Sequence, residues 1–413
     1  MLIGIDDTDS PRGMCTTYLA AVLAQELKGA GMMVREVRLI RLNPNVIYKT
    51  RGNAAVALDV SGSPAQAFDM ACSLVSDLAD LDAENTNPGV VVCEIKPPAD
   101  FYWKAVRGFC ELDEALAVLD AAKALYRGYK NKRGLIGATA ALCSEIPEPT
   151  YELLAYRPRN AWGTPRVVDS SSLFDAEGRT YPHTWDTVDR ENGTVVCVPH
   201  TPDPVLFGIR GERPGWVSFA REWVISEKPS LEQVFVTNQG TDAHLINSHA
   251  GALEEGCSYR VAGTVVSKPV TGPGGHVSFM LEDSGVALRC MAYEPTKGFR
   301  DIVRSLLPGD RVLVCGSYKE GSINLEKMHV TEVARTTEIR PPVCERCGKR
   351  MTSAGFQKGY KCRRCGGRAR DPGIVPVSRS LQSGWYEVPP SARRHLARPL
   401  CRGSPGLPGK DSI

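Results

Sequence analysis

The sequence predicts a multidomain α+β protein, in which a ferredoxin-like α/β region and a second ferredoxin-like domain precede an OB-fold β-barrel and a C-terminal zinc ribbon. Three observations predict this architecture. Strand and helix patterns alternate through the first 250 residues, five strand-like runs follow them, and two Cys-x-x-Cys pairs lie beyond those runs. We expect domains at 1–146, 147–250, 251–338 and 339–370, followed by a basic C-terminal tail at 371–413.

The first region shows the order β-α-β-β-α-β, which is typical of the ferredoxin-like fold. Apolar or alternating runs predict strands, and apolar positions at helical spacing predict helices. The expected strands are 2–5, 34–42, 54–60 and 90–95, and the expected helices are 16–27 and 64–78. A further helix is predicted at 115–125, and a glycine-punctuated segment at 133–138 opens another.

The same order of elements is expected again further along the chain. A strand at 151–156 begins it, a helix near 216–224 and a strand at 233–237 end it, and the strands 194–198 and 205–209 are predicted to pair around Pro202-Asp-Pro204. From about residue 257 to 335, five strand-like runs with a helix (299–306) between the third and fourth predict an OB fold. Another small β-barrel is the alternative.

Composition indicates an ordinary soluble protein, with 42% hydrophobic and 23% charged residues. No apolar run approaches the ~20 residues that span a bilayer, and no signal peptide is evident. Of the 14 cysteines, ten are scattered singly, which fits a reduced compartment better than a disulfide framework. We expect a cytoplasmic protein with no membrane partner; the sequence predicts no particular oligomeric state.

Charge is distributed unevenly along the chain. Residues 341–413 contain 15 Lys and Arg against 4 Asp and Glu, a net charge of +11. Because the whole chain has a net charge of +3, the preceding residues have a net charge of −8. A basic C-terminal region on an acidic body predicts contact with a polyanion.

The strongest local motif is a set of four cysteines, Cys344, Cys347, Cys362 and Cys365. Two such pairs at this spacing can close a tetrahedral Zn²⁺ site, and four thiolates leave no open position for catalysis. We therefore expect a structural zinc ion. More basic side chains surround the ligands than the −2 charge of a Zn–thiolate centre needs, which predicts phosphate contacts. They are Arg346, Lys349, Arg350, Lys361, Arg363 and Arg364.

Three aspartates, Asp6, Asp7 and Asp9, follow the first predicted strand. Ligand sites in α/β sheets gather at the carboxyl ends of strands, and Mg²⁺ takes one or two carboxylates while leaving positions for phosphates. The cluster therefore predicts a metal–nucleotide site. The alternative is that an aspartate caps the helix expected near Cys15. Thr16 likewise could contact a phosphate, act as a nucleophile, or cap that helix.

No Walker A pattern occurs in the sequence, so a nucleotide site must be built otherwise. Two segments could contact phosphates, because glycines permit close approach of the backbone and a helix N-terminus favours anions. The candidates are Lys49 and Arg51 in the first segment and Lys132, Arg133, Gly134 and Gly137 in the second. A solvated surface cluster is the alternative for each segment.

Several longer strings resemble the archaeal tRNA(isoleucine) 2-agmatinylcytidine synthetase family, nearly from end to end of the chain. They are Gly-Ile-Asp-Asp-Thr-Asp-Ser-Pro-Arg-Gly-Met-Cys-Thr-Thr-Tyr at 4–18, Arg-Leu-Asn-Pro at 41–44, Tyr-Lys-Thr-Arg-Gly-Asn at 48–53, Gly-Leu-Ile-Gly at 134–137, Phe-Val-Thr-Asn at 235–238 and Tyr-Glu-Val-Pro-Pro-Ser-Ala-Arg-Arg-His at 386–395. The resemblance implies a kinase-like catalytic domain at the N-terminus. It also implies an ATP-dependent ligase that activates C2 of the wobble cytidine in a CAU anticodon and replaces its oxygen with agmatine.

The resemblance also implies roles for individual residues. Asp6, Asp7 and Asp9 hold Mg²⁺ with ATP, and Thr16 matches the family's phosphate-accepting threonine. Agmatine is a dication, and its guanidinium needs a carboxylate or a stacked aromatic ring. The resemblance places no residue there; we take the turn of Arg210 and Glu212 as the candidate. Arg393 and Arg394, in the last of the matching strings, join the ribbon's basic residues as expected tRNA contacts.

Two other classes of function stay open from the residues alone. An OB fold and a zinc ribbon could form a non-catalytic nucleic-acid-binding protein, and three aspartates could form the metal site of a nuclease. A pure binder has no need of a metal–phosphate site, so the aspartates and Lys132-Arg133 separate the first alternative from an ATP-dependent enzyme.

Overall fold

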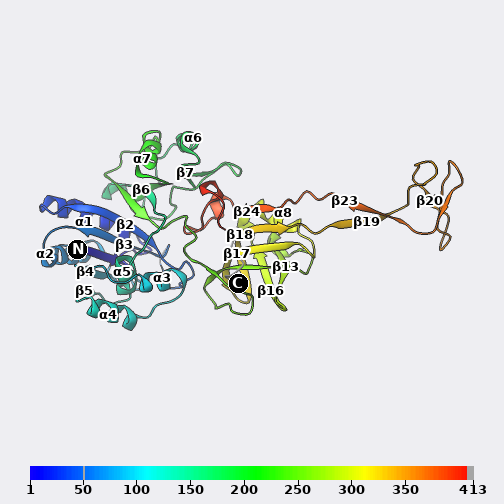
Figure 1. Ribbon diagram of the computed structural model, residues 1–413. Coiled ribbons are helices and arrows are strands. Elements are labelled where there is room, and N and C mark those ends of the chain that lie inside the picture. The colour runs from blue at the N-terminus through cyan, green and yellow to red at the C-terminus, as the bar shows by residue number, and fades with distance from the viewer. Residues whose placement is uncertain (50–51, 407–413) are drawn as a thin grey trace.

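The computed structural model describes residues 1–49 and 52–406. One continuous nine-stranded sheet forms the N-terminal half, and a barrel and a small outlying ribbon follow it (Figure 1). From edge to edge the sheet strands are β5 (Leu125–Gly128), β4 (Gly89–Cys93), β1 (Leu2–Asp6), β3 (Ala54–Val60), β2 (Val34–Arg41), β11 (Leu231–Thr237), β6 (Thr150–Tyr156), β10 (Val205–Gly211) and β7 (Thr184–Trp185).

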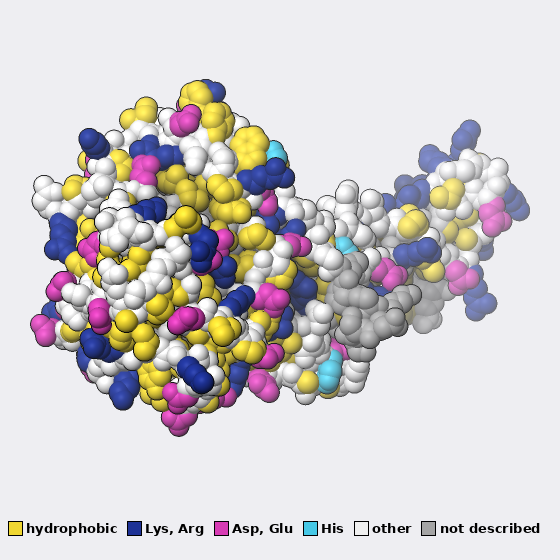
Figure 2. Space-filling view, turned by 60° about the vertical axis from the view of Figure 1, so that its left-hand side comes forward, with side chains coloured by type: hydrophobic (Ala, Val, Ile, Leu, Met, Phe, Trp, Pro, Cys, Tyr) yellow, Lys and Arg dark blue, Asp and Glu magenta, His cyan; other side chains and the backbone are white. Residues whose placement is uncertain are grey.

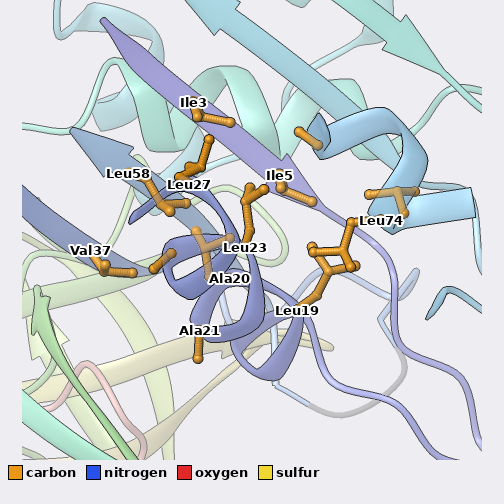
Figure 3. Packing of buried hydrophobic residues seen from close by; sticks show 14 of the residues in the cluster. Ile3, Ile5, Leu19, Ala20, Ala21, Leu23, Leu27, Val37, Leu58 and Leu74 are labelled. Carbon is orange, nitrogen blue, oxygen red and sulfur yellow. The ribbon is translucent and has the colours of Figure 1, made fainter. Parts of the chain in front are cut away.

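In the first part of the sheet, β1 lies between β3 and β4 and is antiparallel to both. Helices α1 (Thr16–Gly29) and α2 (Pro64–Leu78) cover one face. Figure 3 shows α1 packing its leucines against Ile3 and Ile5 of β1. Each such fully buried side chain contributes roughly 1.5–3 kcal/mol relative to exposure, so β1 is held firmly at the centre.

Three more helices, α3 (Asp100–Arg107), α4 (Leu112–Ala121) and α5 (Gly134–Leu142), cover the other face. The helix predicted at 115–125 was wrong at its end: α4 stops at Ala121, and Leu125 begins β5, which pairs with β4. Lys123 has a φ of 51°, a left-handed conformation that breaks the helix. A Cβ on Gly4 of β1 would lie 2.4 Å from the carbonyl oxygen of Ala138, so only glycine lets α5 approach β1 this closely.

The second part of the sheet contains β6, β10 and β11, with helices α6 (Ser170–Thr180) and α7 (Pro214–Glu222) packed on one face. The predicted pairing of 194–198 with 205–209 was wrong. Strand β9 (Thr194–Val195) pairs with β8 (Val188–Asp189), whereas β10 pairs with β6 and β7. Arg166 donates to the backbone carbonyls of Thr201, Asp203 and Val205, and these bonds hold the intervening segment as a loop rather than a hairpin turn.

The two parts join through β2 and β11, which pair in parallel with Val236 opposite Arg38. The first two predicted domains therefore share one sheet.

The barrel is closed by five strands, because β13 pairs with both β15 and β17. Helix α8 (Phe299–Arg304) lies between the third and fourth of them, as predicted. Its strands are β13 (Ser258–Val265), β15 (Val277–Asp283), β16 (Val286–Ala292), β17 (Arg311–Lys319) and β18 (Ser322–Glu332), with β12 (Leu245–Asn247) and β14 (Val270–Thr271) beside them.

The ribbon stands away from the barrel on a two-stranded stalk of β19 (Thr336–Arg340) and β23 (Gly373–Val377) (Figure 1). The chain then returns as β24 (Gly384–Glu387), which pairs with β18. The ribbon is thus an insertion between the barrel strand β18 and its added neighbour β24. Its own strands are β20 (Thr352–Ser353), β21 (Tyr360–Lys361) and β22 (Arg368–Ala369). Among the helices described, none has the length and apolar character to cross a membrane.

Candidate functional site

The aspartate cluster lies at the carboxyl end of the central strand β1. Asp6 is the last residue of that strand, and Asp7 has a φ of 58°, an uncommon conformation for a residue other than glycine. Burial and the neighbouring Asp7 raise the pKa of Asp6 well above its ordinary value. Burial also raises the pKa of Asp7, to about 6, although Arg133 opposes this shift. Such carboxylates are poised to accept a cation.

Helix capping does not explain the aspartates. The residue that caps α1 is Cys15, and its side chain makes no capping hydrogen bond. Thr16 is the first residue of the helix and is buried; its Oγ1 accepts a hydrogen bond from the hydroxyl of Thr8 at 3.1 Å.

A cavity of about 390 Å³ opens beside the aspartates. It brings together Asp6, Asp7, Asp9, Lys49, Arg133 and Gly137 from the predicted set. Arg133 donates to Asp7 Oδ2 at 3.2 Å and stacks on the ring of Tyr48. The cavity therefore combines carboxylates with cationic side chains, as a metal–phosphate site requires.

Other residues of the predicted phosphate set lie elsewhere. Lys132 is exposed, and Gly134 packs so closely on β4 that a Cβ would lie 2.4 Å from the backbone nitrogen of Gly89. Neither residue lines this cavity. Arg51 lies outside the described residues.

A second cavity of about 280 Å³ adjoins the first, since Asp9, Gly52 and Ala54 line both. It contains Thr16 and the predicted Arg210, together with carboxylates from the second part of the sheet. We call the first the aspartate cavity and the second the threonine cavity.

One wall of the threonine cavity is a network of buried charges that the sequence did not indicate. Glu152 on β6 accepts from Arg210 at 3.2 Å and lies 3.9 Å from the guanidinium of Arg41 on β2. Arg210 also donates to Nδ1 of His395 at 2.6 Å. Burial lowers the pKa of Arg41 to about 10. Asp203 lies elsewhere on the lining, 3.4 Å from Arg166.

No local pattern marks Arg41, Glu152, Asp203 and His395 as a set, because they come from segments far apart in the sequence. The only hint was that Arg41 and His395 belong to strings that resemble the synthetase family.

Three other predicted contacts lie outside both cavities. Glu212 forms an ion pair with Arg402. Arg393 pairs with Asp186 and Glu387, and Arg394 lies 3.2 Å from Glu326. Arg393 and Arg394 thus form ion pairs with Asp186, Glu387 and Glu326, and their contact with tRNA stays a prediction.

The four ribbon cysteines form a cluster whose sulfur atoms all lie within 4.8 Å of one another. Backbone N–H groups of Cys365 and Arg364 lower the pKa of the Cys362 thiol to about 6, which favours the metal-binding thiolate. The six predicted basic side chains are exposed, and Figure 2 shows Lys and Arg over the outlying ribbon.

Fold and site together define a class: a multidomain protein with a carboxylate-lined cavity at a strand end, an adjoining small cavity, a closed barrel and a four-cysteine ribbon. Three family models match most of this chain. They are the TiaS TCKD domain (residues 2–65 and 60–131), the TiaS FLD domain (residues 132–244) and the TiaS C-terminal zinc ribbon domain (residues 341–381).

Full-length relatives agree with these matches. The tRNA(isoleucine) 2-agmatinylcytidine synthetase TiaS of Methanocorpusculum labreanum is 50% identical over 403 residues, and that of Methanosarcina mazei is 44% identical over 416 residues. In both comparisons 97% of each chain is covered. The chain therefore belongs to the TiaS family of tRNA(isoleucine) 2-agmatinylcytidine synthetases.

Solved structures of this family superpose closely on the chain. Apo TiaS gives a TM-score of 0.90 at 42% identity, with 97% of each chain covered. The complex of TiaS with its isoleucine tRNA and ATP gives 0.88 at 42% identity, covering 99% of this chain and 98% of the other. The complex of TiaS with the same tRNA, AMPCPP and agmatine gives 0.86 at 40% identity, with 97% and 96% covered.

Proposed function

We propose that this protein uses ATP to modify the wobble cytidine of the CAU-anticodon isoleucine tRNA, replacing its C2 oxygen with agmatine to give 2-agmatinylcytidine. The product pairs with adenine, so the tRNA reads AUA. The observation that carries this conclusion is the match to agmatidine synthetases over 97% of each chain. The two adjoining cavities provide the separate places that a phosphate donor and a small amine need. Nothing favours a pure binding protein or a nuclease.

The aspartate cavity is the proposed ATP site. Asp6, Asp7 and Asp9 would hold Mg²⁺, because carboxylate oxygens are the ligands this ion takes. Burial raises the pKa of Asp6 and Asp7 and so disfavours their ionised forms, and a bound cation would stabilise those forms again. Mg²⁺ supplies neutralisation of phosphate charge during transfer. Lys49 and Arg133 line the same cavity and would contact the phosphates. Gly137 lines the cavity as well, and the roles of Arg51, Lys132 and Gly134 in ATP binding stay predictions.

The chemistry requires activation before substitution. A carbonyl oxygen is a poor leaving group, so the O2 atom first accepts a phosphoryl group. The neutral primary amine of agmatine then attacks C2, and the phosphorylated oxygen departs. Thr16 lines the threonine cavity, as Asp9 does. Its hydroxyl would contact the phosphoryl group during transfer.

The threonine cavity is the proposed site of the amine and the pyrimidine. Agmatine carries a guanidinium that needs a carboxylate partner. Of the two predicted residues, Arg210 lines the cavity but shares agmatine's charge, while Glu212 does not line it and is paired with Arg402. Asp203 lines the cavity as a carboxylate, and we assign it the guanidinium.

The proposed fold classes rest on strand order. Both parts of the large sheet follow the ferredoxin-like order 4-1-3-2, as β4-β1-β3-β2 and β11-β6-β10-β7. The barrel closes in the order β13-β15-β16-β18-β17 with α8 between the third and fourth strands, which supports an OB fold. The proposed domain bounds stay 1–146, 147–250, 251–338, 339–370 and 371–413.

The ribbon and the barrel would deliver the tRNA. Arg346, Lys349, Arg350, Lys361, Arg363 and Arg364 are exposed around the cysteine cluster, where phosphates could reach them. A structural Zn²⁺ would hold that ribbon together. A tRNA substrate and reduced cysteines support a cytoplasmic location.

The test incubates the protein with CAU-anticodon tRNA, radiolabelled agmatine and Mg·ATP. We expect label to enter the tRNA, and no label to enter a tRNA with a different anticodon. Asp7→Asn should abolish incorporation while leaving tRNA binding largely intact, because the ribbon stands away from the large sheet that holds the aspartates (Figure 1). Well-folded, tRNA-binding wild-type protein that transfers no label would refute the proposal.

A further inference from the structure

The chain beyond the ribbon completes the threonine cavity. After β24, residues 390–402 run between the barrel and the large sheet. The carbonyl of His395 accepts from the backbone N–H of Gly240 at 2.8 Å, and the carbonyl of Leu396 accepts from that of Asp242. Arg394 donates to the side chain of Asn45 at 2.9 Å. These contacts place the imidazole of His395 in the cavity wall.

Hydrogen bonding defines the form of the His395 ring. An arginine N–H can only donate, so Nδ1, which lies 2.6 Å from the Arg210 guanidinium, must accept. The ring is then neutral, with its proton on Nε2. Burial, together with Arg41 and Arg210, lowers the pKa of His395 well below its ordinary value, in agreement with this form. Within the described residues, the Nε2–H has no acceptor of its own.

The Nε2–H lies near the junction of the two cavities. Gly52, which lines both, is its neighbour: a Cβ at that position would lie 3.7 Å from Nε2 and 2.7 Å from the Arg41 guanidinium. This wall therefore presents hydrogen-bond donors, and its charge is net positive, because Arg41 and Arg210 face the single carboxylate of Glu152. It would repel the ammonium and guanidinium ends of agmatine, but it suits an acceptor such as a pyrimidine O2.

We infer that His395 is a substrate-positioning residue, whose Nε2–H donates a hydrogen bond to the O2 edge of the target cytosine, beside Arg41 and away from Asp203, the carboxylate assigned to the guanidinium of agmatine. This inference rests on the proposed function. It adds that different parts of the cavity bind the two substrates: the wall of hydrogen-bond donors binds the base, and Asp203 binds agmatine. A donor at O2 also stabilises the negative charge that this phosphorylated oxygen gains as the C2–O2 bond breaks.

Two amide substitutions separate this role from a structural one. In His395→Asn, the side-chain oxygen can replace Nδ1 as the acceptor for Arg210, but the donor at the Nε2 position is lost. In His395→Gln, the amide nitrogen can replace the Nε2 donor, while the acceptor for Arg210 is lost. The measurements are kcat and KM for agmatine incorporation into CAU-anticodon tRNA, with melting temperature and tRNA affinity as checks on folding.

We expect His395→Asn to lower kcat on the order of 100-fold, with the KM for agmatine nearly unchanged, and His395→Gln to keep at least about a tenth of the wild-type kcat. Equal kcat values in the two folded variants, or the higher value in His395→Asn, would overturn the inference. Wild-type protein measured alongside separates the two proposals: if it transfers agmatine, the reaction stands whatever the variants do.

Discussion

At the scale of single residues, the site depends on one glycine of α5. Gly137 faces Asp6 so closely that a Cβ there would lie 1.8 Å from the carboxylate Oδ2. The sequence marked Gly137 as a position for close approach, and the neighbour that the structure places there is the Asp6 side chain. The position of the Asp6 carboxylate in the aspartate cavity therefore depends on the absence of a side chain at Gly137.

Gly137→Ala should displace the Asp6 carboxylate without unfolding the protein, since the side chain can move toward the cavity. We expect agmatine incorporation to fall at least about 100-fold, because Asp6 is a proposed metal ligand and small misplacements of such a group are costly. Gly29→Ala at the end of α1 is the matched control, since its Cβ would meet nothing within 4 Å. Radiolabel incorporation by both variants decides the matter; an active Gly137→Ala would show that the position of Asp6 is unimportant.

At the scale of elements, β18 is tied to the chain that returns from the ribbon through Glu326. This carboxylate accepts from His244 at 2.9 Å and lies 3.2 Å from Arg394. Burial alone would raise its pKa, but His244 and Arg394 outweigh burial and lower it to about 2. The ionised form of Glu326 therefore stabilises the contact between the barrel and the returning chain.

A carboxyl whose pKa is lowered on folding contributes stability that is present above about pH 4.5 and lost as the pH falls toward 2. We expect Glu326→Gln to reduce the free energy of unfolding at pH 7 by on the order of 3 kcal/mol. The deficit should shrink steadily between pH 5 and about pH 3. Thermal melting of wild type and variant across this range measures it, and a deficit independent of pH would assign the loss to packing instead.

Most strands and helices could be predicted because their patterns are local. The run that forms β1, the helical spacing of α1 and the cysteine pairs of the ribbon each lie within a short stretch. The joint between β2 and β11 could not, because it depends on which distant segments meet. The hairpin of β8 and β9 could not either, because each of its strands has only two residues, too few to show a pattern. The site divides in the same way: the aspartates are neighbours in sequence, whereas Arg41, Glu152 and His395 meet only through the path of the folded chain.

At the scale of the whole molecule, the ribbon and its stalk are an insertion that leaves the barrel closed. Before the insertion, β18 pairs with β17. After the insertion, the chain returns as β24, which also pairs with β18. The ribbon's own apolar core is only Cys344, Met351 and Cys362 with a few partners. A core this small depends on its metal ion for stability.

Removal of zinc should therefore affect RNA binding and spare the body. With a chelator, or in Cys362→Ser, we expect tRNA affinity to fall at least about tenfold as the basic side chains lose their arrangement. The main melting transition should stay within a few degrees. Filter binding and calorimetry measure the two effects, and restoration of affinity by added Zn²⁺ is the control. Loss of the main transition would contradict an independent ribbon.

The returning chain also has a consequence for biosynthesis. The three aspartates leave the ribosome before the barrel and the ribbon, whereas His395 emerges only after both have been made. Until then the threonine cavity of a nascent chain lacks the part of its wall that His395 forms. Polypeptides interrupted between the ribbon and His395 would carry the carboxylates without the proposed base-positioning group, and we expect them not to transfer agmatine.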